Sequence, residues 1–294
     1  MYTLTPHSHL PTLPRLPRTC RATATSPART STADPPRHLP ITATTTITTP
    51  ATANGSSLHS TWAHRAWVAS GFASVLSSLA KSVSAAVDSG SAFDPLLAAF
   101  LGYILTDLGT GFYHWAIDNY GGPSTPIFGR QIEAFQGHHR WPWTITQREF
   151  ANNLHALARA VTFAVMPIEF FATANDAAVH AFVGACAGCV MMSQQFHAWA
   201  HGTKSRLPPV VVALQDVGVL VSRAEHAAHH RPPYNSNYCI VSGVWNGLLD
   251  EWKVFEAMEM MVFFRFGVRP RSWSELELEW KEESGGVSSE SHNC

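Results

Sequence analysis

Nine histidines stand in short, regularly spaced groups along the middle of the chain. They are His114, His138, His139, His155, His197, His201, His226, His229 and His230. The last three, in "AEHAAHHRPPY", occupy positions i, i+3 and i+4, and "QFHAWAH" holds an i, i+4 pair. Such positions share one face of a helix. Because imidazole is the commonest metal ligand in proteins, this pattern predicts a metal site.

The number of imidazoles indicates which metal they hold. Zinc is saturated by four ligands, so nine histidines exceed what one zinc ion uses. We therefore predict two ions. An all-imidazole shell suits Fe(II), which, unlike zinc, can change its oxidation state. The predicted cofactors are two iron ions with O2 as co-substrate, and we predict no catalytic side chain beyond the metal ligands and no other cofactor site.

Apolar segments that could cross a bilayer position most of these histidines. Hydrophobic residues make up 46% of the chain and charged residues only 14%, against roughly 25% charged in ordinary soluble domains. A membrane helix needs about 20 mostly apolar residues. Residues 92–118, 154–174 and 176–201 meet this length, although the second contains Pro167 and Glu169.

Two further segments leave their placement open. Residues 66–87 form a fourth candidate span, but Lys81 and several serines also fit an amphipathic surface helix. Residues 208–222 are too few for a comfortable crossing, so we expect a re-entrant or interfacial segment. The predicted fold is an all-α integral membrane protein, with about four transmembrane helices plus interfacial helices that cap a histidine-rich diiron site.

The loop charges predict an orientation. Arg130, Arg140 and Arg148 lie in the 119–153 connection, and further basic residues follow position 201, whereas the "TAND" connection has neither lysine nor arginine. By the positive-inside rule, the first two regions share the cytoplasm-equivalent face. All nine histidines fall on that face. An iron pair at a membrane edge suits O2-dependent oxidation of lipid C–H bonds, which are too strong for acid–base chemistry.

The ends of the chain differ in composition from its middle. Residues 1–57 carry several arginines, many serines and threonines and one acid, which predicts a disordered chloroplast transit peptide, with an ordinary disordered tail as the alternative. We assign 58–91 to a linker and possible first membrane helix, 92–268 to the core domain, and 269–294 to a polar, acidic tail. The net charge of −1 gives no reason to expect a nucleic-acid partner.

Four longer stretches resemble a known family. "DLGTGFYHWAIDNYG", "QIEAFQGHHRWPWTITQREFANNLH", "QFHAWAH" and "EHAAHHRPPYNSNYCIVSGVWNGLLD" are similar to the membrane lipid desaturases that include plastid fatty acid desaturase 4, a phosphatidylglycerol desaturase, and the animal plasmanylethanolamine desaturases. The resemblance covers about residues 92–255. It implies that the core is a lipid desaturase domain and that all nine histidines are iron ligands. Asp118 and Asp107 would orient imidazoles, or Asp118 would itself be a ligand.

The plastid branch of the family implies a specific reaction and setting. The reaction is insertion of a trans-3 double bond into the sn-2 palmitate of phosphatidylglycerol. The chain would lie in a chloroplast membrane, thylakoid or envelope, as a multi-pass protein whose metal site faces the stroma. A soluble donor, most simply ferredoxin, would supply electrons.

Three other functions remain open at this stage. A diiron lipid hydroxylase would begin with the same hydrogen abstraction, and the animal branch forms a vinyl ether on plasmanyl lipids. A membrane protein that binds or transports metals is the non-enzyme alternative. We expect histidines along a path through the membrane in that case, rather than gathered on one face.

Overall fold

The computed structural model describes residues 58–173 and 175–274, and the regular elements within them are all helices. The predicted all-α class is therefore confirmed for this part of the chain. The α-helices are α1 (Trp62–Ser89), α2 (Phe93–Asn119), α3 (Gly129–His138), α4 (Phe150–Phe171), α5 (Ala177–His201), α6 (Pro209–Asp216), α7 (Arg223–His229), α8 (Asn246–Glu251) and α9 (Val254–Phe266). Two short 3-10 helices, η1 (Pro142–Gln147) and η2 (Lys204–Arg206), connect them.

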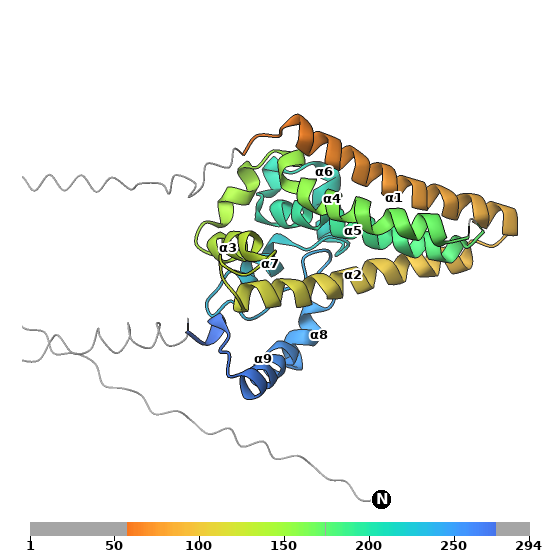
Figure 1. The fold of residues 1–294 in the computed structure, drawn as a ribbon. Coiled ribbons are helices and arrows are strands. Elements are labelled where there is room, and N and C mark those ends of the chain that lie inside the picture. Colours follow the sequence, from red (N-terminus) through yellow and green to blue (C-terminus); the bar gives the residue numbers. More distant parts are fainter. Residues whose placement is uncertain (1–57, 174, 275–294) are drawn as a thin grey trace, which may run out of the picture. The chain divides into compact units, whose positions relative to one another are not determined.

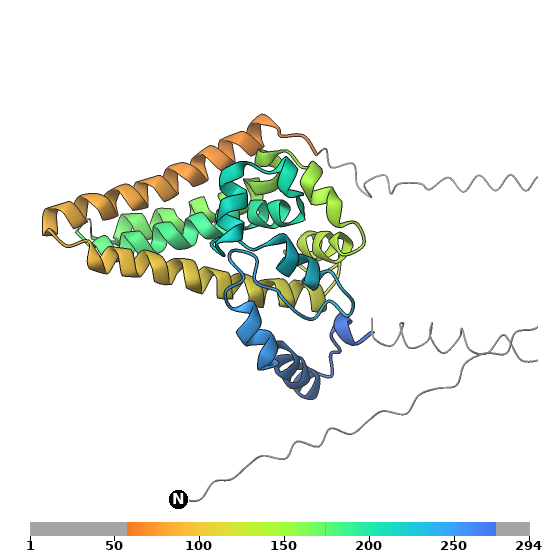
Figure 2. The ribbon, with the colours of Figure 1, turned by 180° about the vertical axis from the view of Figure 1, so that it is seen from behind.

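Four long helices, α1, α2, α4 and α5, pack side by side (Figure 1). Along the chain, α1 and α2 run in opposite directions, and so do α4 and α5, with α1 and α4 pointing the same way (Figure 1). The carboxyl ends of α2 and α5 therefore lie at the same end as the amino ends of α1 and α4. The short helices α3, α6 and α7 gather at that end, as the view from behind also shows (Figure 2). This topology brings histidines that are distant in sequence to one end of the helices.

Three helices, α2, α4 and α5, are long and apolar enough to cross a membrane. Large apolar side chains on them face outward, among them Phe100 on α2 and Phe163 and Phe170 on α4. An exposed apolar surface of this extent suits contact with lipid. The three stronger sequence predictions are thus confirmed as helices with the length and composition of a membrane span, with α4 running from Phe150 to Phe171 rather than 154–174.

The fourth predicted span corresponds to α1, which has the length to cross but is not among these three helices. It packs on α4 and α5 through a core that includes Val68, Val75 and Met191. A crossing by α1 stays a prediction. The segment predicted to be too short is α6, whose eight residues extend about 12 Å, far less than a bilayer core.

Lys81 and Glu169, which weakened the sequence prediction of two spans, lie together. The Lys81 ammonium is 2.6 Å from a Glu169 carboxylate oxygen. The other oxygen accepts hydrogen bonds from Ser78 and from the His180 ring. Charged groups inside apolar helices are costly unless paired, so this cluster joins α1, α4 and α5 without leaving a charge alone. His180 therefore has a structural role in this cluster.

Close packing of α2 on α5 depends on small residues. A Cβ on Gly102 would lie 2.9 Å from the Phe182 carbonyl oxygen and 3.2 Å from the Cys186 sulfur. Only glycine allows this approach of the two helices. Cys186 therefore belongs to a helix contact.

The predicted transit peptide at 1–57 lies outside the described residues, as does the 275–294 part of the predicted acidic tail.

Candidate metal centre

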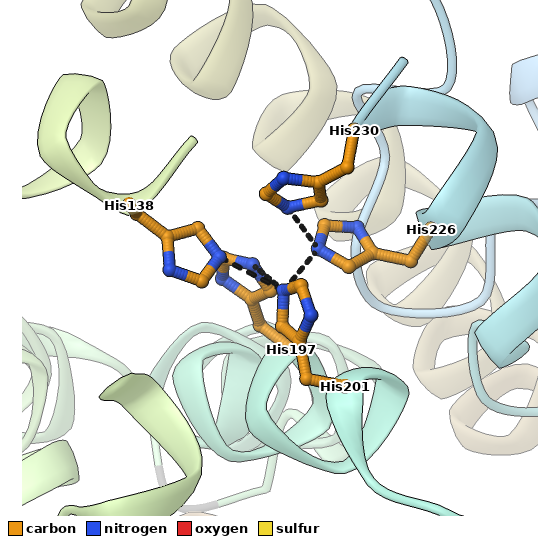
Figure 3. A group of neighbouring side chains, drawn as sticks. All are labelled: His138, His197, His201, His226 and His230. Atoms are coloured by element: carbon orange, nitrogen blue, oxygen red, sulfur yellow. Dashed lines mark hydrogen bonds between the residues drawn. The ribbon is translucent and has the colours of Figure 1, made fainter. Parts of the chain in front are cut away.

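Five imidazoles converge between α3, α5 and α7 (Figure 3). This five-histidine group consists of His138, His197, His201, His226 and His230. The His201 Nε2 atom lies 2.8 Å from that of His138, 2.9 Å from that of His226 and 3.3 Å from that of His197. The Nε2 atoms of His226 and His230 are 3.2 Å apart. The ring nitrogens thus face a common point from three separate elements.

Hydrogen bonding among the rings cannot account for this convergence. A neutral imidazole has one N–H donor and one acceptor nitrogen, so the single Nε2 of His201 cannot bond to three neighbouring nitrogens at once. Protonation would worsen the contacts, because charged rings repel one another. A cation at the common point would satisfy every lone pair. The donor set therefore fits a metal ion.

A second group of ligands adjoins the first. It contains His114, Asp118, His139 and His229, and we call it the mixed group. One oxygen of Asp118 lies 3.0 Å from Nε2 of His139, 3.2 Å from that of His114 and 3.4 Å from that of His229. Within the described part of the chain, the buried Nε2 atoms of His114 and His229 have no hydrogen-bond partner of suitable geometry. Three imidazoles and a carboxylate also form a suitable donor set for iron.

The two groups lie side by side because α7 and the end of α3 contribute to both. His226 and His230 belong to the five-histidine group, whereas His229, between them in sequence, belongs to the mixed group. The ring centroids of His139 and His230, one from each group, are 4.9 Å apart. A capping box starts α7: the Ser222 hydroxyl accepts from the Glu225 N–H and the Glu225 carboxylate accepts from the Ser222 N–H. The arrangement suits two neighbouring ions.

Backbone carbonyls of the 236–243 loop orient two of the rings. His114 Nδ1 lies 3.0 Å from the Tyr238 carbonyl oxygen, and His229 Nδ1 lies 2.8 Å from the Ser236 carbonyl oxygen. Since a carbonyl can only accept, each Nδ1 carries the proton and each Nε2 keeps its lone pair. Such outer partners set the tautomer and orientation of metal-binding histidines.

Asp107 anchors this loop. One oxygen of its fully buried carboxylate accepts hydrogen bonds from the backbone N–H groups of 241, 242 and 243, at 3.0, 2.8 and 3.1 Å. The sequence prediction had Asp107 accept from an imidazole. It instead binds the loop whose carbonyls orient His114 and His229, so its effect on the centre is indirect.

Burial keeps the extramembrane histidines of the centre neutral. Removal from water lowers the pKa of His138 to about 2 and that of His229 to about 4. The desolvated His230 also has a lowered pKa. Because a protonated imidazole cannot ligate a metal, these shifts keep the rings in the form that a cation requires.

A cavity of about 620 Å³ opens onto the centre. His114, His138 and His197 line it, together with apolar side chains that include Phe135, Leu157 and Ile240. The volume is in the range of small-molecule sites. An apolar substrate in this cavity would contact metal ligands from both groups.

Comparison with known proteins assigns the family. The model of the lipid desaturase domain matches residues 103–273. The chain belongs to this family. It is 64% identical to fatty acid desaturase 4, chloroplastic, of Arabidopsis thaliana over 76% of this chain and 69% of that protein. Identity to fatty acid desaturase 4-like 2, chloroplastic, of the same plant is 50% over 95% and 97% of the two chains. A plasmanylethanolamine desaturase of Myxococcus xanthus is 33% identical over 60% and 63%. No solved structure matches.

The lipid desaturase chain brings eight of the nine predicted histidines into the two groups, and His155 lies outside both. His155 stands in the first turns of α4, where its Nδ1 is 2.8 Å from the Asn152 carbonyl oxygen. Its ring stacks on His64 with centroids 3.9 Å apart. It lines the cavity instead. Asp118, predicted as a ligand or as an orienting acceptor, has an oxygen at the centre of the mixed group.

Sequence reasoning missed the loop carbonyls and the cavity of this lipid desaturase. Any residue type provides a backbone carbonyl, so the roles of Ser236 and Tyr238 leave no trace in the sequence. The cavity wall combines residues from five helices and a loop. A pattern within one stretch of sequence cannot predict a surface that is assembled from so many segments.

Proposed function

We propose that this chain desaturates an acyl chain of a membrane phospholipid, using two iron ions and O2. The observation that carries the proposal is the pair of adjacent ligand groups beside a largely apolar cavity. The proposed ligands are the eight converging histidines and Asp118. When bound, the iron pair supplies the redox chemistry: O2 takes two hydrogen atoms from the acyl chain, together with two electrons and two protons, and leaves as two waters.

The side chains of the protein hold and shield this chemistry. The 236–243 loop keeps Nε2 of His114 and His229 directed at the mixed group, so no ring must turn when metal binds. The apolar cavity wall orders an acyl chain against the centre and excludes water from it. An ordered, dry site favours removal of hydrogen atoms from the chain over side reactions with solvent.

The resemblance to the plastid branch favours a more specific reaction. We propose that the substrate is phosphatidylglycerol and that the product carries a trans-3 double bond in its sn-2 palmitate. The proposed setting is a chloroplast membrane with the metal centre facing the stroma, because Arg140, Lys204 and Arg206 stand in the connections at the histidine end. We propose ferredoxin as the electron donor.

Vinyl-ether formation is the second candidate function. It is favoured by the similarity to the Myxococcus xanthus plasmanylethanolamine desaturase. Removal of vicinal hydrogens from an ether-linked chain needs the same iron pair, so only the lipid bound in the cavity would differ.

Expression of the full chain in a host that lacks trans-3 acids tests these assignments. Phosphatidylglycerol and a plasmanyl lipid are supplied together with ferredoxin and its reductase, and the lipids are analysed by mass spectrometry. We expect trans-3-hexadecenoate in phosphatidylglycerol and about two irons per purified chain. Plasmalogen alone would favour the second candidate, and a hydroxy-acyl product would assign a hydroxylase. One bound zinc without iron would contradict the diiron proposal and favour a metal-binding or transport role.

A further inference from the structure

The cavity beside the metal centre has an unbalanced charge. Among its 25 lining residues are two arginines, Arg130 and Arg148, but no aspartate or glutamate. Most of the remaining wall is apolar or formed by neutral polar groups. An entirely apolar lipid would not need a cation here. The lining therefore suits a ligand with a long apolar part and an anionic group.

Arg148 is available for such an anion. It stands where η1 ends, and its Nη1 donates to the Asn152 side-chain oxygen at 3.3 Å. It forms no ion pair with any described residue. The neighbouring carboxylate of Glu149 is already occupied, since it accepts from the His59 ring at 2.8 Å and from the Ser60 N–H at 2.7 Å.

Partial desolvation supports this reading of Arg148. Arg148 is exposed as a residue, but protein on one side of its guanidinium withdraws the group partly from water and lowers the pKa of Arg148. The group stays charged, because an arginine pKa begins far above neutrality. A guanidinium at the edge of an apolar cavity gains most from an anion that arrives with its own apolar chain, since the bound lipid then shields the ion pair from water.

The position of the arginines also matches the proposed chemistry. Arg130 and Arg148 line the same cavity as His114, His138 and His197. In a phospholipid, the third acyl carbon lies close to the ester and hence to the phosphate. A site that oxidises this carbon must hold the headgroup near the metal ligands. A site that acts far down the acyl chain would instead hold the headgroup far from the metal ligands.

We propose that Arg148, assisted by Arg130, binds the phosphate of an anionic phospholipid and so favours it over a zwitterionic lipid, in which the headgroup ammonium already offsets the phosphate charge. This inference rests on the proposed function, and it names the residues that determine its substrate specificity. A guanidinium forms paired hydrogen bonds with phosphate oxygens, which a lysine ammonium cannot reproduce. Loss of Arg148 should therefore weaken binding of the anionic lipid more than it slows the chemical step.

The test compares Arg148→Gln, Arg148→Lys, Arg130→Gln and a matched control, Arg206→Gln. Arg206 is an exposed arginine of η2 that does not line the cavity. Each purified full-length protein is incubated with mixed vesicles of phosphatidylglycerol and phosphatidylcholine. The lipids that stay bound after washing are then counted by mass spectrometry. Desaturation kinetics with each lipid and iron content are measured on the same samples.

We expect Arg148→Gln to lower the bound ratio of phosphatidylglycerol to phosphatidylcholine about tenfold, as loss of hydrogen bonds to a charged group predicts. It should raise KM for phosphatidylglycerol by a similar factor while iron content and kcat stay near wild type. Arg148→Lys should recover part of the selectivity, Arg130→Gln should show a smaller loss, and Arg206→Gln should match wild type. Inorganic phosphate should not displace the lipid, because it lacks the apolar chain.

Unchanged lipid selectivity in Arg148→Gln, with or without Arg130→Gln, would overturn the inference. Displacement by inorganic phosphate would also overturn it, since the site would then bind phosphate in general. The retention measurement does not depend on turnover. If the wild-type chain retains anionic lipid through Arg148 but forms no trans-3 product, the proposed reaction fails while the assignment of Arg148 stands.

Discussion

Replacement of Asp107 by alanine should damage both the fold and the mixed metal group, although its carboxylate accepts hydrogen bonds from the 236–243 loop and not from a metal ligand. The carboxylate accepts three backbone N–H groups of the 236–243 loop, and all of them are buried. Each unsatisfied donor costs about 1–3 kcal/mol. With some relaxation of the loop, we expect a total loss of about 3–5 kcal/mol, which lowers Tm by roughly 6–20 °C for a chain of this size.

The same substitution should reduce metal binding. A released loop no longer holds the Ser236 and Tyr238 carbonyls against His229 and His114, so both rings lose their fixed tautomer and direction. We expect iron to fall from about two to about one per chain, because the five-histidine group does not use this loop. Thermal unfolding in detergent and metal analysis of the purified protein measure the two effects.

Two companion variants make the Asp107 experiment decisive. Asp107→Asn keeps a side-chain oxygen acceptor and should lose less Tm and less iron than Asp107→Ala. Asp88→Ala removes an exposed aspartate from the last turn of α1 and should change stability by no more than about 0.5 kcal/mol. If Asp107→Ala keeps two irons and a Tm within about 2 °C of wild type, the loop does not orient the mixed group as we argue.

Three further predictions test other parts of the structure. His197→Gln should lose iron from the five-histidine group and abolish desaturation. His155→Gln should keep its full iron content, because the His155 ring lies outside both groups. Metal analysis of the two purified proteins shows which of the two histidines is a metal ligand. Gly111→Ala places a Cβ 2.5 Å from the Cys239 sulfur, so it should lower Tm by several degrees, and the double variant with Cys239→Ala should recover part of that loss when both are melted in parallel. Burial raises the pKa of the Glu259 carboxyl above its ordinary value of 4.5, so the folded chain binds this proton more tightly than the unfolded chain does. The fold therefore loses stability as the pH rises from the unfolded pKa through the folded pKa. Between about pH 4 and 7, the Tm of the chelator-treated protein should fall less steeply in Glu259→Gln than in wild type.

The structure reinterprets two acidic residues that the sequence had placed near the imidazoles. Asp118 and His114 are four residues apart on α2, and this spacing correctly indicated that the carboxylate and the ring are neighbours. Asp107 lies two turns earlier on the same helix, and the family resemblance implied an imidazole partner for it as well. Its actual partners are N–H groups more than 130 positions later in the chain, and no local periodicity reports them.

Patterns within short stretches of sequence were enough to predict the long apolar helices and the presence of a metal site. Hydropathy and length identify α2, α4 and α5 from the sequence, because each window contains the information that makes a segment helical and apolar. Because successive spans run in opposite directions, the order of these segments along the sequence is enough to predict that the nine histidines lie on the same side of the membrane. The residue types then predict a metal site and a redox metal.

Only the tertiary structure decided how those histidines divide. His229 and His230 are adjacent, yet one belongs to the mixed group and the other to the five-histidine group. His155 has the expected position on α4, yet its ring stacks on His64 rather than joining either group. These outcomes depend on distances between atoms of helices far apart in the chain. Such distances are set by how whole helix surfaces pack, and a sequence pattern describes one surface at a time.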